Sequence, residues 1–160
     1  MAGIRTGAEL ANFLRKALEI EMGFESVSQW EGYINVKKDD FRDIIFTLIS
    51  ESEKHRGLVE AMISKVKGPF GSKALPLQPH SFNFKNKVES EIMMDLFRYE
   101  KLAYDTYLNI REALQNSNIG SLVDEKDAPF FLSTLDVLIK EEANHTDLLT
   151  RYLGHVERIR

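Results

Sequence analysis

One stretch of sequence occurs twice in this chain of 160 residues, and both copies place a histidine at the same position. The first copy is LISESEKHRGLV, residues 48–59, and the second is LIKEEANHTDLL, residues 138–149. Aligning His55 with His145 matches the apolar residues at both ends and the polar residues in the middle. Apolar residues spaced three and four apart indicate a helix with one buried face. Each copy therefore predicts a helix whose buried face carries a histidine.

Four segments of the chain carry apolar residues at helical spacing, and we expect a helix in each. These segments cover residues 8–30, from 39 or 40 to 68, 87–115, and from 127 to at least 152. The first opens with Thr6-x-x-Glu9, a capping box in which the hydroxyl and the carboxylate each satisfy a free backbone N–H. Asp127 and Pro129 suit the start of the fourth. Helices of about 30 residues would be about 45 Å long, which favours a bundle.

The connections predict how these helices follow one another. The connection around EGYINVKK is short, which favours antiparallel packing of the first two helices. Residues 67–86 contain three of the four prolines and show no helical period. A connection of that length can return along the outside of the bundle to the opposite end. We therefore expect one all-α domain over residues 1–160, a four-helix bundle with one long crossover between helices 2 and 3.

Composition removes several classes of function. The chain has no cysteine, so any metal ion must be bound through nitrogen and oxygen, and disulfides and iron–sulfur clusters are excluded. The net charge is −4 with both signs interspersed, and no basic stripe for nucleic acid is visible. No apolar run approaches the ~18 residues of a membrane span, and the first residues lack a signal-peptide pattern. We expect a soluble, cytoplasmic protein that binds neither nucleic acid nor membrane.

Metal-binding side chains fall on the apolar faces of all four expected helices. Glu21 lies on the inner stripe of the first helix, whereas Glu19 falls off that stripe and is expected to face solvent. Glu100 takes the same place on the third helix, and the two histidines lie on the second and fourth. A carboxylate on an apolar face is unfavourable by several kcal/mol unless it is paired or neutralised. Divalent cations between the helices would neutralise these carboxylates.

The motifs Glu100-x-x-Ala103-x-x-x-Tyr107 and Glu142-x-x-His145 resemble the second-half ligand motifs of ferritin-like, rubrerythrin-like di-iron proteins. In that family the first and third helices each give one glutamate, and the second and fourth each give a Glu-x-x-His pair. The resemblance covers essentially the whole chain and implies a ferritin-like bundle that binds two iron ions. The same ligand types also suit manganese and zinc. Carried over residue by residue, the resemblance implies the ligands Glu21, His55, Glu100, Glu142 and His145.

The first half departs from the family pattern at one ligand. Ser52 stands where the second half has Glu142, so one carboxylate of the family set is missing. Glu51 lies four residues before His55 on the same helix face and is expected to replace it. Without Glu51 the site would be asymmetric, with its second metal weak or absent.

A second departure concerns residues next to the expected ligands. Tyr107 is expected to hydrogen-bond a metal-bound carboxylate or, alternatively, to pack in the core with its hydroxyl satisfied. Ser28 stands where the first helix would repeat this tyrosine. His80 and His155 show no partner pattern, and we expect both at the surface.

Three functions remain open at this stage. The resemblance implies a di-iron redox enzyme that reacts with dioxygen or peroxide, as a ferroxidase or peroxidase, and takes electrons from an external donor. The same site could serve iron storage in an assembly, and a homodimer or larger homo-oligomer is expected, with Trp30 or Phe84 as exposed contacts. A helical binding or structural module that has lost a working metal pair is the third alternative, and Ser52 favours it.

Overall fold

The structure, a computed structural model, describes residues 3–26, 39–68, 77–79, 82, 84 and 86–159. Within these ranges the chain is all-helical, with four long helices and no strand. The long helices are α1 (Gly7–Ser26), α3 (Asp39–Ser64), α4 (Glu89–Gln115) and α5 (Ala128–Ile159). Two short 3-10 helices, η2 (Ile119–Ser121) and η3 (Glu125–Asp127), lie between α4 and α5. The prediction of an all-α chain is confirmed.

The ends of the helices follow the local signals in the sequence. At the start of α1 the backbone N–H of Glu9 donates to Oγ1 of Thr6 at 3.1 Å, and the N–H of Arg5 donates to the Glu9 carboxylate at 3.0 Å. The predicted capping residues therefore act as expected. The second helix ends at Ser64, earlier than predicted, and Gly68 then adopts φ 123°, which favours glycine. Residues 27–30, the predicted end of the first helix, lie outside the described ranges.

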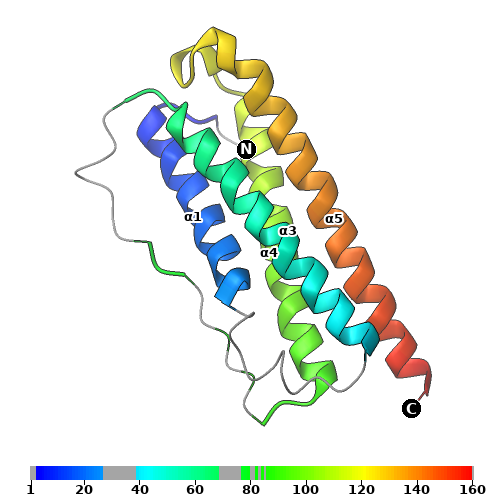
Figure 1. Cartoon of the computed structure of the whole chain (residues 1–160). Helices are drawn as coiled ribbons and strands as arrows, with labels where there is room; N and C mark the ends of the chain where they lie inside the picture. Colours follow the sequence, from blue (N-terminus) through cyan, green and yellow to red (C-terminus); the bar gives the residue numbers. More distant parts are fainter. Residues whose placement is uncertain are drawn as a thin grey trace.

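The four helices pack as a bundle in which α1 contacts mainly α3, and α4 contacts mainly α5 (Figure 1). In Figure 1, α3 and α4 run in the same direction, whereas α1 and α5 run the opposite way. The end of α3 and the start of α4 therefore lie at opposite ends of the bundle. The connection between α3 and α4 therefore joins opposite ends of the bundle.

Two aromatic residues of this connection cover the side of the bundle formed by α1 and α4. The ring of Phe82 lies 5.7 Å from Phe24 of α1 and 4.8 Å from Tyr99 of α4, measured between centroids. Phe84 packs on Phe82 at 5.4 Å and is only 4 % exposed. The expectation that Phe84 is an exposed dimer contact is therefore wrong. Both rings are buried against the bundle.

Several other expectations fall on parts of the chain that the structure does not describe. Ser28, Trp30 and His80 lie outside the described ranges, and so does the side chain of His155. None of the described helices is long and apolar enough to cross a membrane.

The apolar stripe predicted for each helix faces the common core. Along α1 and α3, for example, Leu14 and Phe24 and then Leu48 and Val59 are all buried. Between these apolar positions each helix carries buried polar side chains near its middle: Glu21, Ser52, His55, Glu100, Glu142 and His145. The bundle thus has an apolar core that is interrupted halfway by an acidic and imidazole cluster.

Candidate metal centre

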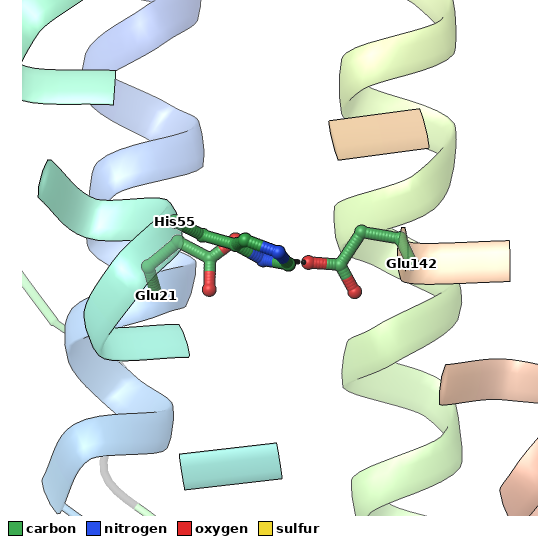
Figure 2. A group of neighbouring side chains, drawn as sticks. All are labelled: Glu21, His55 and Glu142. Carbon is green, nitrogen blue, oxygen red and sulfur yellow. Dashed lines mark hydrogen bonds and ion pairs between the residues drawn. The ribbon is translucent and has the colours of Figure 1, made fainter. Parts of the chain in front are cut away.

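Five of the six predicted ligands converge in the middle of the bundle, one or two from each long helix. Their exposed fractions are 0 % for three of them, 1 % for Glu142 and 4 % for His145. They form two overlapping groups whose potential ligand atoms lie within 4.8 Å of one another, Glu21–His55–Glu142 and Glu100–Glu142–His145. Figure 2 shows the first group, with the imidazole between the two carboxylates. The side chains predicted to meet from four separate helices are together in the structure.

Glu142 of α5 belongs to both groups. Its Oε1 lies 2.8 Å from Nδ1 of His55, the contact that is dashed in Figure 2. Its Oε2 lies 3.4 Å from Nδ1 of His145. One carboxylate therefore faces two imidazoles at once, which is the arrangement of a carboxylate that could bridge two cations.

The other two inner carboxylates, Glu21 and Glu100, each lie next to one histidine at a similar distance. Glu21 of α1 lies 3.4 Å from Nδ1 of His55, and Glu100 of α4 lies 3.3 Å from Nδ1 of His145. The two imidazole rings stack with centroids 5.6 Å apart and an interplanar angle of 27°. Both Nδ1 atoms thus face the inner carboxylates.

Four buried polar atoms of this cluster have no hydrogen-bond partner among the described residues. They are Glu21 Oε2, Glu100 Oε1, Glu142 Oε2 and His145 Nε2. Buried polar atoms are nearly always hydrogen-bonded, because an unpaired one loses its solvation without compensation. Three unpaired carboxylate oxygens and one imidazole nitrogen in a single dry cluster are suitable ligands for a cation. These buried groups could therefore bind a metal ion.

Burial changes the protonation of the inner glutamates. It raises the pKa of Glu21 from 4.5 to about 7, although hydrogen bonds from His55 and Tyr107 work against that rise. Burial also raises the pKa of Glu100 well above its usual value. Burial would raise the pKa of Glu142 too, but its interactions with Glu100 and with both histidines outweigh burial and lower that pKa. The lowered pKa favours the ionised, negatively charged form of Glu142.

The histidines carry the compensating positive charge. Burial would lower the pKa of both rings, but their hydrogen bonds to the glutamates raise it to about 11 for His55 and about 10 for His145. Without metal, imidazolium protons on the two histidines thus compensate the charge of the inner glutamates. A bound cation would take over this neutralising role, and its binding would release protons.

The missing carboxylate of the first half is not replaced on the inner side of the rings. Ser52 is buried, 1 % exposed, and offers only a hydroxyl. The carboxylate of Glu51 lies 3.5 Å from Nε2 of His145 and 4.0 Å from Nε2 of His55. Glu51 does lean toward the site, but it approaches the ring nitrogens opposite to those that face the inner carboxylates.

Glu141 is a site residue that the sequence reasoning missed. Its Oε2 lies 2.7 Å from Nε2 of His55, and its Oε1 accepts a hydrogen bond of 2.6 Å from Nζ of Lys54. The repeat held the signal, because Glu141 aligns with Glu51. Both stand four residues before their histidine, so the argument applied to Glu51 also applied to Glu141.

The predicted neighbours of the ligands behave differently from one another. Tyr107 is fully buried and its hydroxyl donates to Oε1 of Glu21 at 2.6 Å, so it hydrogen-bonds a candidate ligand. Glu19 is turned away from the centre, as expected, and accepts a hydrogen bond from the backbone N–H of Gln78.

Comparisons of the chain with protein-family models, with curated proteins and with solved structures found no match.

Proposed function

We propose that this chain is a ferritin-like carboxylate protein that binds two divalent transition-metal ions, iron in the first place, at the buried cluster. One ion would be held by Glu21 and His55, the other by Glu100 and His145, and Glu142 would bridge them. The observation that carries the proposal is Glu142, whose two oxygens face the two imidazoles while oxygens of all three inner carboxylates lack hydrogen-bond partners in the described chain.

The arrangement of the helices supports the ferritin-like assignment. A bundle with parallel second and third helices joined by one long crossover is the ferritin-like arrangement. The helices α1 and α4 each contribute one inner glutamate, and α3 and α5 each contribute one histidine, which follows the order of ligands in that family. Ser52 remains the departure.

Charge predicts that the two ions are bound unequally. Three inner carboxylates compensate one divalent cation fully, whereas two such cations bring four positive charges against three negative ones. The second ion therefore needs an additional anion, such as hydroxide, and is expected to bind more weakly than the first.

A bound ferrous pair would supply electrons to dioxygen or peroxide, the chemistry of a ferroxidase or peroxidase. The residues of this chain would hold and orient the ions and keep water away, since the inner side chains are at most 4 % exposed. Tyr107 would fix the Glu21 carboxylate through its hydrogen bond. With no cysteine in the chain, the electrons that restore the centre would come from a separate donor protein.

A second function is favoured by the buried hydroxyl of Ser52. The chain could be a helical binding or structural module that holds one ion or none, with imidazolium protons in place of metal. An iron-storage role in a larger assembly would use the same centre as the redox function, and the native mass would separate the two.

Metal analysis of the protein purified without chelator, and again after anaerobic loading with ferrous iron, tests the proposal. About two ions per chain would support the di-metal centre. About one would favour the single-metal alternative, and none after loading would contradict the proposal. Sizing the native particle in the same samples would distinguish a dimer from a shell.

A further inference from the structure

The centre has one side on which its side chains reach solvent. Among the site residues described above, the inner ligands are at most 4 % exposed, but the side chain of Glu51 is 36 % exposed and that of Glu141 is 21 % exposed. Glu51 lies on α3 and Glu141 on α5, whereas the α1–α4 side is covered by Phe82. An ion from solvent would therefore meet the α3–α5 side first.

On this side the two carboxylates face the outer nitrogens of both histidines. Glu141 contacts Nε2 of His55 at 2.7 Å, and Glu51 lies 3.5 Å from Nε2 of His145. The Nε2 atom of His145 is buried and has no hydrogen-bond partner in the described chain, although it is aimed at Glu51. Oxygen atoms of Glu51 and Glu141 and Nε2 of His55 lie within 4.8 Å of one another, close enough to hold one cation.

A cationic group already occupies the outer edge of this cluster. The ammonium of Lys54 lies 2.6 Å from Oε1 of Glu141, and the lysine side chain is 54 % exposed. Ion pairs this exposed are weak, so the ammonium exchanges easily with other cations. A divalent ion interacts with the same carboxylates at twice the charge.

We propose that Glu51 and Glu141 form the loading site of the centre, where an incoming divalent cation displaces Lys54 before it reaches the inner carboxylates. This inference rests on the proposed function. A neutral imidazole has a single lone pair, so one ring cannot hold an ion on Nε2 and another on Nδ1. The outer position is therefore transient. Once an ion is bound at Nδ1 of His55, the Nε2–H donates to Glu141, which then orients the ring.

The rate of cobalt loading tests this proposal. Metal-free protein is mixed with Co²⁺ in a stopped-flow instrument, and the visible absorption of the bound ion is followed to its end point. The double variant Glu51→Gln/Glu141→Gln should load at least about tenfold more slowly, because the attracting charge is gone. At saturating Co²⁺ the double variant should still fill the inner positions, whose carboxylates it keeps, although its affinity should fall because Glu141 no longer orients His55. The control Glu60→Gln/Glu112→Gln removes the same charge from exposed positions on α3 and α4 and should load at the normal rate.

The lysine gives an opposite expectation. Lys54→Met should load severalfold faster than the unchanged protein, whereas Lys101→Met, which removes an exposed lysine paired with Asp105 on α4, should not. An unchanged loading rate in the double glutamine variant would overturn the loading site. A lower final cobalt content at a normal rate would also overturn it and would make the two glutamates equilibrium ligands. If the unchanged protein binds no cobalt and no iron, the proposed function itself fails, and the loading site with it.

Discussion

The two halves of the molecule, α1 with α3 and α4 with α5, build the centre from the same parts. Each half gives one inner glutamate, one histidine, and a glutamate four residues before that histidine. They differ three residues before the histidine, where the first half has Ser52 and the second has Glu142. Because the two histidines face each other, the carboxylate of Glu142 contacts both. Glu142 thus supplies to His55 a carboxylate contact that Ser52 cannot make.

The outer glutamates show how closely the halves depend on each other. Glu141 of the second half pairs with His55 of the first, and Glu51 of the first lies nearest to His145 of the second. Each histidine therefore has a glutamate of the opposite half beside its outer edge, and in the case of His55 this glutamate is hydrogen-bonded to the ring. Contacts between the two halves, rather than a complete set of ligands within each half, therefore hold this centre together.

The largest expected effect comes from removing the shared carboxylate. Glu142→Gln should weaken binding of both metal ions by more than about 100-fold. Loss of a group that only orients a ligand costs up to about 100-fold in affinity, and loss of a ligand should cost more. Ser52→Ala, at the equivalent position, should leave both affinities unchanged. Titration of Fe²⁺ or Co²⁺ against a competing chelator measures the two affinities. Weaker binding of only one of the two ions in Glu142→Gln would show that Glu142 is not shared.

Restoring the symmetry should change stability in opposite directions with and without metal. Ser52→Glu buries another carboxylate, which should destabilise the metal-free protein by about 3 kcal/mol. Bound metal should reverse the effect and raise the occupancy of the second ion. Urea unfolding with chelator and with saturating metal measures both. The control Ser133→Glu, exposed on α5, should change stability by less than about 0.5 kcal/mol in either condition. Destabilisation that persists with metal would argue against a vacant ligand position at Ser52.

The metal-free protein should lose stability as the pH rises. Burial raises the pKa of Glu21 from 4.5 to about 7, so its contribution is complete below pH 4.5 and is lost as the pH rises through 7. The raised pKa of both histidines acts in the same direction from their usual value of 6.5 upward. Between pH 5 and pH 7, Glu21 alone should reduce the unfolding free energy by about 2 kcal/mol.

Metal affinity should rise with pH, because the two imidazoles and Glu21, whose pKa values are raised, must lose their protons before they bind an ion. Chelator-controlled unfolding and metal titrations at pH 5.5, 6.5 and 7.5 would show both trends. A metal-free stability that increases over this range would contradict the charge assignment of the cluster.

The smallest effect should come from Tyr107, a tyrosine of the second half. Tyr107→Phe removes the hydroxyl that donates to Glu21 and should destabilise the metal-free protein by about 1 kcal/mol. It should also raise the pKa of Glu21 further, because that hydrogen bond lowers it. The control Tyr104→Phe, on the same helix but partly exposed, should leave stability unchanged in the same denaturant measurement. Equal effects of the two variants would show that the Tyr107 hydrogen bond contributes nothing.

The sequence by itself determined which face of each helix is buried. Helical periodicity is a local property, so the inward positions of Glu21, His55, Glu100 and His145 could be predicted from their apolar neighbours. The internal repeat also predicted that the two histidines take equivalent places. The lack of cysteine limited any metal site to oxygen and nitrogen ligands.

Only the tertiary structure decided which carboxylate faces which nitrogen of the two imidazole rings. That Glu142 faces both Nδ1 atoms, and that Glu51 and Glu141 face the Nε2 atoms, depends on the distances between different helices. The burial of Phe84 was likewise decided by packing of the crossover against the bundle. The physical reason is that periodicity fixes the direction of a side chain from its own helix, whereas its partner depends on how separate helices pack.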